Sequence, residues 1–96
     1  MIIKIVYNSD YKSQFDFYYD LINKLHDITI ESYDTKYTSD AKKGIKVRGT
    51  FGARLEPFVG IYSDEGKILK GFYTEVLECK VDNIINYLNN YEGNDE

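Results

Sequence analysis

Residues that could carry chemistry are few in this sequence and lie far apart. The chain has one cysteine, Cys79, and one histidine, His26. Ser9 and Ser13 do not combine with His26 in a pattern typical of a nucleophile and its base. Metal binding needs histidines, cysteines or carboxylates clustered at ligand spacing, and one histidine with a distant cysteine does not meet this need. We therefore expect no catalytic residue, no metal site and no cofactor, and the sequence leans away from an enzyme.

Two further features invite a chemical interpretation. Cys79 precedes the last predicted helix and cannot form an intrachain disulfide, so a buried structural cysteine is favoured over a reactive thiol. The stretch Gly49-Thr50-Phe51-Gly52 has glycines but lacks the Gly-Lys-Ser/Thr ending of a phosphate-binding loop. We interpret Gly52 as the C-terminal cap of a helix, since glycine readily takes the left-handed conformation.

Apolar patterning predicts the first three elements. Residues 2–7 are β-branched or apolar except for Lys4, which predicts a central strand buried on both faces. Ser13 and Asp16 form a capping-box-like helix start. The apolar stripe of this helix consists of Phe15, Tyr18, Ile22 and Leu25, widened by Tyr19 and Leu21. Residues 27–33 alternate in polarity and predict a strand toward the sheet edge.

Glycines and the one proline help to delimit the predicted elements in the second half of the chain. Residues 34–50 predict a short or distorted helix, although Ile45 and Val47 could equally alternate in a strand. Pro57 is expected at the start of strand 58–62, because proline cannot donate to a sheet ladder. Residues 63–66 predict a hairpin loop into strand 67–73. After a polar connection, the last helix has Asp82 in its first turn and an apolar stripe of Val81, Ile84, Ile85 and Leu88.

These elements predict an α/β fold with the order β-α-β-α-β-β-α. Two strands joined through a helix imply a parallel crossover, and the hairpin adds an antiparallel arm. We therefore expect a four-stranded mixed sheet with helices on both faces. Residues 1–91 would form a single domain, and residues 92–96 an acidic C-terminal tail.

The order of elements and the stretch around Pro57 together resemble the thioredoxin-like family, which includes thioredoxins and glutaredoxins. The matching residues are Phe51-Gly52-Ala53, the spacing from there to Pro57, the two strands that follow, and the terminal helix. The resemblance covers nearly the whole chain in element order but few individual residues. It implies a thioredoxin-like fold in which Pro57 is a cis proline that faces the active-site loop of the family.

The same resemblance exposes a missing motif. Members of the family act through Cys-x-x-Cys or Cys-x-x-Ser in the loop after the first strand, where the helix N-terminus lowers the pKa of a thiol. Here that loop, residues 8–13, reads Asn-Ser-Asp-Tyr-Lys-Ser and contains no sulfur. Thiol–disulfide exchange requires a thiolate, so we expect a non-redox member. A glutathione-binding or single-thiol protein using Ser9 or Cys79 is the alternative.

Two surfaces are candidates for binding. By resemblance, family members dock extended peptides or glutathione beside the proline, which would join two segments in one groove: Ser9, Asp10, Tyr11, Lys12, Leu55, Glu56 and Pro57. The second candidate is a basic stretch whose charged residues are Lys42, Lys43, Lys46, Arg48 and Arg54. It is interpreted as a solvated helix face, with an acidic partner or a phosphate backbone as the alternative.

The composition limits the classes of partner and the cellular compartment that we expect. The net charge of −4 argues against nucleic acid and anionic membranes as partners. No apolar run reaches the length of a bilayer span, which predicts a cytoplasmic protein. The ten tyrosines suit a half-buried binding surface, although a base-composition bias of the genome explains them equally. We expect a small protein-binding or assembly module, and the composition also fits a phage protein, either virion-associated or host-interacting.

Overall fold

The computed structural model describes residues 1–91, so the predicted acidic tail, residues 92–96, lies outside the described residues. The predicted order of strands and helices is confirmed. In chain order the elements are β1 (Ile2–Tyr7), α1 (Lys12–Lys24), β2 (Thr29–Asp34), α2 (Thr38–Phe51), β3 (Phe58–Tyr62), β4 (Ile68–Tyr73), the 3₁₀ turn η1 (Thr74–Val76) and α3 (Val81–Asn90).

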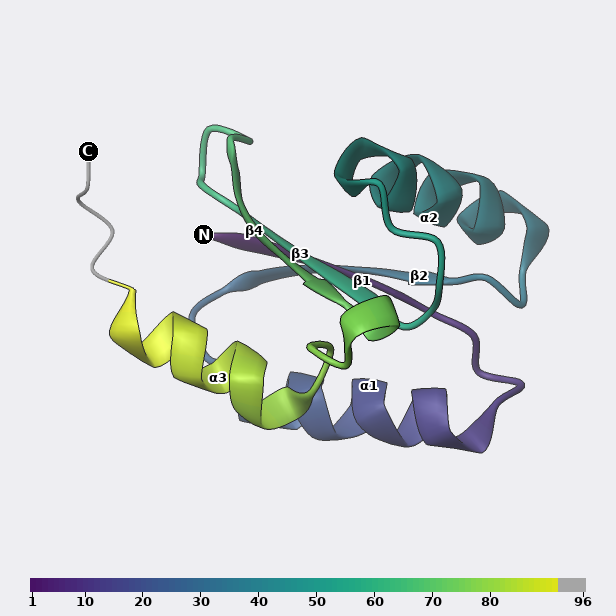
Figure 1. The fold of residues 1–96 in the computed structure, drawn as a ribbon, viewed down its shortest axis with the longest axis horizontal. Helices are drawn as coiled ribbons and strands as arrows, with labels where there is room; N and C mark the ends of the chain where they lie inside the picture. The colour runs from purple at the N-terminus through teal and green to yellow at the C-terminus, as the bar shows by residue number, and fades with distance from the viewer. Residues whose placement is uncertain (92–96) are drawn as a thin grey trace.

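The strands form a mixed four-stranded sheet in the order β2-β1-β3-β4. β1 pairs in parallel with β2 through the α1 crossover, and it pairs antiparallel with β3, which in turn pairs antiparallel with β4. The prediction that the first strand is central is therefore confirmed. Figure 1 shows α1 and α3 on one face of the sheet and α2 on the other, as the two-sided burial of β1 requires. The molecule is a small α/β domain.

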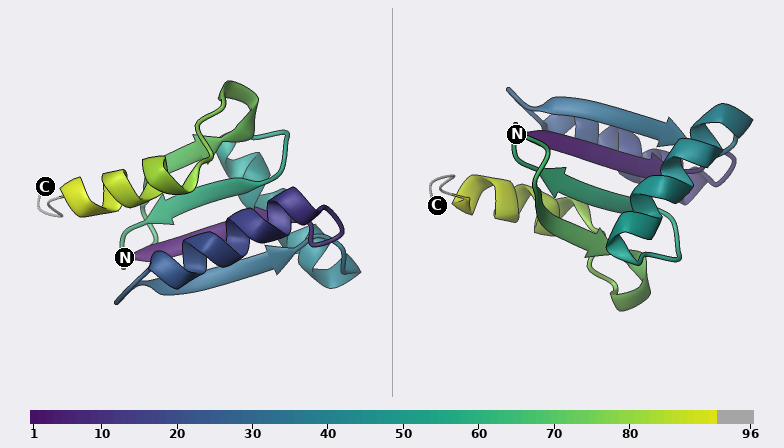
Figure 2. Two further views of the ribbon diagram at one scale, coloured as in Figure 1. Left: turned by 90° about the horizontal axis from the view of Figure 1, so that it is seen from below. Right: turned by 90° about the horizontal axis from the view of Figure 1, so that it is seen from above.

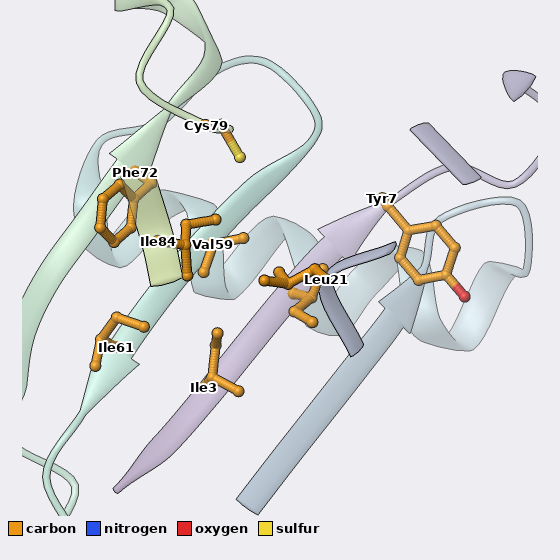
Figure 3. Packing of buried hydrophobic residues seen from close by; sticks show 9 residues of the cluster. Ile3, Tyr7, Leu21, Val59, Ile61, Phe72, Cys79 and Ile84 are labelled. Atoms are coloured by element: carbon orange, nitrogen blue, oxygen red, sulfur yellow. The ribbon is translucent and has the colours of Figure 1, made fainter. Parts of the chain in front are cut away.

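The larger core lies between the sheet and the two helices α1 and α3 (Figure 3). Alternate residues of β1, with Ile3 and Ile5 fully buried, face Leu21 of α1 and Ile84 of α3. Alternation along a strand sends successive side chains to opposite faces, which is why Val6 belongs instead to the α2 side. The predicted stripe of α3 is confirmed, since Val81, Ile85 and Leu88 pack against this core.

The smaller core, under α2, is largely aromatic. Val6, Val47, Ala53 and Phe58 are buried there, and Phe51, at the end of α2, packs against them. The Phe51 ring lies over a glycine pair, Gly60 and Gly71, which face each other in the β3–β4 register. A Cβ at Gly71 would come within 2.7 Å of the Phe51 ring, so neither strand could carry a side chain at this point.

The start and stripe of α1 differ from the prediction. The helix begins at Lys12 after Tyr11, which makes no side-chain capping bond, so the Ser13–Asp16 capping box is not formed. Only Leu21 is fully buried, while Phe15 and Tyr19 are exposed on the outer surface. The predicted stripe was too wide because apolar rings at three- and four-residue spacing need not all face the core.

The helix predicted within residues 34–50 is confirmed over the strand alternative, but α2 is a continuous helix of 14 residues rather than a short or distorted one. Gly44 is explained by packing: a Cβ there would meet Val6 at 2.8 Å. Gly52 caps the helix at φ 72°, as predicted. The hairpin of residues 63–66 is also confirmed, with Gly66 at φ 87°. Between α2 and β3, the Glu56–Pro57 peptide bond is cis.

Candidate functional site

The predicted groove residues lie at one end of the sheet, which we call the loop end. It consists of the segments 8–11, 34–37, 52–57 and 74–78. β1 and β2 are parallel and both finish there, while β3 begins at Phe58 opposite Tyr73, the last residue of β4. Figure 2 shows the connections after β1, β2 and β4 together with the segment before β3 at this end.

Ser9 is fixed by the carboxylate of Asp34, the last residue of β2. The Ser9 backbone N–H donates to Asp34 Oδ1 at 3.0 Å, and the Lys36 N–H donates to the same atom at 3.1 Å. Burial alone would raise the pKa of the Asp34 carboxyl, but hydrogen bonds from Ser9 and Lys36 outweigh it and lower the pKa. An ionised Asp34 therefore ties the loop after β1 to the turn after β2.

The remaining residues of that loop point outward. Asp10 lies 3.5 Å from the Lys36 ammonium, and Lys12 lies 2.7 Å from Asp16 one helical turn later. These are exposed pairs, which contribute little to stability. Tyr11 is also exposed. The loop thus presents one ring and two surface ion pairs to solvent.

Glu56, just before the cis bond, is held from two sides. The Thr35 hydroxyl lies 2.9 Å from Glu56 Oε1 and 3.2 Å from the Tyr7 carbonyl oxygen, so it can donate to either. The Arg48 guanidinium lies 3.8 Å from the other carboxylate oxygen. Thr35 therefore links the end of β1 to the segment before Pro57, and both halves of the predicted groove contact residues 34–36.

The basic stretch does not form one face. Lys42, Lys43 and Lys46 are exposed on α2, and Arg54 is exposed in the loop that follows. Arg48 instead turns inward, where its Nη1 donates to the Arg54 carbonyl oxygen at 2.8 Å. Within the described residues its Nε is buried without a hydrogen-bond partner. Arg48 is therefore a structural residue that braces segment 52–57.

Two further hydrogen bonds join segment 52–57 to the turn after β4. The Thr74 hydroxyl donates to the Pro57 carbonyl oxygen at 2.6 Å, and the Arg54 N–H donates to Glu75 Oε2 at 2.5 Å. Apolar side chains nevertheless project into solvent here: Leu55 is 50% exposed, Val76 62% and Leu77 73%. Leu77 also has a left-handed backbone at φ 60°, a conformation that leucine rarely adopts. We call Leu55, Val76 and Leu77 the apolar triad.

Cys79 follows this turn but faces the core. It is buried in the cluster with Val59 and Ile84, and Figure 3 shows its side chain among those core residues. Burial raises the pKa of the Cys79 thiol to about 12, although a hydrogen bond with Thr74 acts in the opposite direction. Such a thiol is almost entirely protonated at neutral pH and is a poor nucleophile.

Among residues 1–91, no group of three or more His, Cys, Asp and Glu side chains is placed to hold a metal ion. His26 is exposed just beyond the end of α1. Within the same residues, no helix has both the length and the apolar character needed to cross a bilayer.

The fold and the loop end define a small α/β domain whose braced loops expose apolar side chains. Comparison of the sequence with protein-family models finds no match, and comparisons with curated proteins and with solved structures find none either.

Sequence reasoning missed the residues that hold the site together. The sequence indicates Thr35 only as a possible helix cap and does not point to Asp34, Thr74 or Glu75, although all four lie at or just after the end of a strand, where polar side chains often bond to turn backbones. Val76 and Leu77 were also missed, because they lie in a stretch treated only as a polar connection.

Proposed function

We propose that this chain is a thioredoxin-like protein without dithiol chemistry that binds an extended segment of another protein at the loop end. The thioredoxin-like assignment is supported by the element order, the mixed sheet and the position of Pro57 immediately before β3. The observation that carries the binding proposal is the apolar triad, which is exposed on braced loops beside Pro57.

Preformed loops favour this function energetically. A surface whose backbone is already fixed loses little conformational entropy when a partner binds. The exposed leucine and valine side chains supply apolar surface that a partner can bury. Burying such surface contributes about 25 cal/mol of binding free energy per Å². The left-handed backbone of Leu77 is also consistent with a binding role, since strained residues concentrate at ligand sites.

The alternative, a glutathione-binding or single-thiol redox protein, is less well supported. It needs a thiol whose pKa is lowered, whereas burial raises the pKa of Cys79. It also needs access to the sulfur, which the core around Val59 and Ile84 denies.

The proposal can be tested with peptides selected from a random displayed library against the whole protein. Selected peptides should perturb the backbone NMR signals of residues 53–57 and 74–78. The double variant Leu55→Ser/Leu77→Asn should weaken binding at least tenfold, which corresponds to about 1.4 kcal/mol. Asparagine is chosen at position 77 because it tolerates the left-handed conformation. Ile45→Ser, which removes an exposed apolar side chain from α2, is the matched control and should leave the affinity unchanged.

Two further arms separate the proposal from its alternative. Cys79→Ala should bind the same peptides with unchanged affinity, because the thiol is buried in the core and is not exposed to a partner at the loop end. Titration with reduced glutathione should leave the signals of residues 8–12 and 55–57 in place. Failure to select any peptide, or equal binding by the double variant, would overturn the proposal. Saturable shifts with glutathione would support the alternative instead.

A further inference from the structure

β2 forms one outer edge of the sheet, and that edge is open. Figure 2 shows β2 as the outermost strand beside β1, with no helix or strand of residues 1–91 beyond it. The N–H groups of Thr29 and Thr35 donate to carbonyl oxygens of Met1 and Tyr7, so odd-numbered residues direct their backbone toward β1. Ile30 and Ser32 consequently direct their backbone groups outward, and so does the Asp34 N–H, while the Asp34 carbonyl oxygen accepts the Tyr37 N–H at 3.0 Å.

This edge lacks several of the usual protections against pairing, although it carries the acids Glu31 and Asp34. Natural edge strands are commonly blunted by proline, lysine or a bulge. β2 has neither proline nor lysine, and its register with β1 is regular from Thr29 to Asp34. The opposite edge is different, because β4 carries Lys70 and pairs with β3 through an irregular register beside Tyr62.

β2 carries two acids, Glu31 and Asp34, and each has a partner within the chain; Asp34 Oδ1 accepts the Ser9 and Lys36 N–H groups. The Glu31 carboxylate lies 3.7 Å from the Lys4 ammonium and accepts a hydrogen bond from the Tyr33 hydroxyl at 2.8 Å. An incoming strand therefore does not meet an uncompensated charge at the centre of β2.

Exposed apolar side chains flank the same edge. Phe15 is 43% exposed, Tyr19 57% and Ile30 37%, and the two rings lie 6.1 Å apart. Ile30 stands beside Ile3 in the register, so its side chain lies on the face covered by α1. We call these three exposed residues, two on α1 and one on β2, the edge patch.

The helical geometry places the two rings on the β2 side of α1. Lys24 faces α3, since it lines a cavity together with Ile85 and Leu88. Successive helix residues turn by about 100°, which puts Phe15 about 180° from Lys24 around the axis. Figure 2 shows α3 over the β3–β4 half of the sheet and α1 over the β1–β2 half. The side of α1 that points away from α3 is therefore the side of the open edge.

We propose that β2 pairs antiparallel with β2 of a second copy of this chain, joining two sheets into one continuous sheet. The register is centred on Ser32, so that the outward N–H and C=O groups of Ser32 in the two copies bond to each other. Ile30 then lies opposite Asp34 of the second copy, and Glu31 lies opposite Tyr33. A register centred on Glu31 would instead place like charges directly opposite, which is destabilising.

A second copy fits the edge patch better than an unrelated strand does. The two-fold axis of this pairing is perpendicular to the sheet, so both α1 helices lie on the same face. Phe15 and Tyr19 of each copy then approach the same seam from opposite sides and cover it. Such self-complementarity is the property of an isologous interface. A single extended peptide would satisfy the edge but leave the rings exposed.

The register can be tested by disulfide trapping. In a directly opposed hydrogen-bonded pair the Cα atoms are about 5.5 Å apart, a distance that a disulfide can bridge. Ser32→Cys should form a covalent dimer when treated with diamide. Ile30→Cys is the matched control and should form no covalent dimer, because it faces Asp34 of the second copy. A folded Ser32→Cys variant that forms no covalent dimer, or equal trapping of Ile30→Cys, would overturn the proposal.

Sedimentation of the unmodified protein provides an independent test. The protein should sediment with twice the chain mass of 11.2 kDa. Ser32→Pro removes only an outward N–H and should yield folded monomer, as should the double variant Phe15→Ser/Tyr19→Ser. Ile45→Ser should remain dimeric, and circular dichroism should report the native fold for all variants. A wild-type monomer, or a dimer that survives Ser32→Pro, would overturn the proposal. The open edge meets the loop end only at Asp34, and the apolar triad lies on other segments, so neither result affects the peptide-binding proposal.

Discussion

The ring of Phe51 lies over Gly60 so closely that a Cβ at position 60 would stand 2.8 Å from the Phe51 Cε1 atom. The ring cannot readily move aside, because it also packs against Phe58, with ring centroids 4.9 Å apart, and against Tyr62 at 5.6 Å. This contact fixes the end of α2, and the loop end begins one residue later at Gly52.

Gly60→Ala should therefore destabilise the protein by about 1–3 kcal/mol, the usual effect of overpacking a core. Urea unfolding followed by circular dichroism measures this change. Gly49→Ala is the matched control, since nothing lies within 4 Å of a Cβ there and the site is an exposed helix position. It should stabilise the protein by about 0.5–1 kcal/mol. Equal effects at the two sites would contradict the packing role of Gly60.

Asp34 should make stability sensitive to acid. Its pKa is lowered in the folded protein, so its contribution is complete above the unfolded-state pKa, near 3.9, and is lost as the pH falls through the folded-state value. Asp34→Asn should flatten the dependence of the free energy of unfolding on pH below about pH 4. Asp20→Asn, at an exposed helix position, should retain the wild-type slope. Parallel curves for wild type and Asp34→Asn would argue against this assignment.

Leu77 should lower the stability of the fold and raise the affinity for peptides at the loop end. Its left-handed backbone at φ 60° costs leucine roughly 1–2 kcal/mol, a cost that glycine avoids. Because glycine also loses more entropy on folding, Leu77→Gly should raise the free energy of unfolding by roughly 0.5–1 kcal/mol. The same variant should lose affinity for peptides selected at the loop end. Thermal unfolding and peptide titration on one sample check both effects, and a stabilised variant with full affinity would exclude Leu77 from the binding surface.

Sequence patterning predicted those parts of the fold that local periodicity encodes. The two-sided burial of β1, the stripe of α3 and the glycines at residues 52 and 66 all follow from the chain itself. Gly44 misled the prediction of α2, because its reason is contact with Val6 on a distant strand rather than a helix break. Phe15 and Tyr19 misled the prediction of α1, because periodicity alone does not distinguish an apolar helix face that packs in the core from one that is exposed to solvent.

The loop end was only half predicted. Its location follows from strand order, since parallel strands finish at the same end of a sheet. Its internal braces join residues distant in the chain, such as Thr35 with Glu56 and Thr74 with Pro57. Contacts of this kind leave no local pattern, and the exposure of Leu77 depends on them.

The central position of β1 has a consequence for the order of folding. This strand precedes both of its partners, and Ile2 must meet Thr29 on one side and Tyr62 on the other. The first pairing closes a short loop through α1, whereas the second must wait until residues 58–62 are available. Until then, the β3-facing edge of β1 stays open and much of each core stays uncovered. A nascent or truncated chain that ends before residue 58 is therefore expected to aggregate more readily than the whole chain.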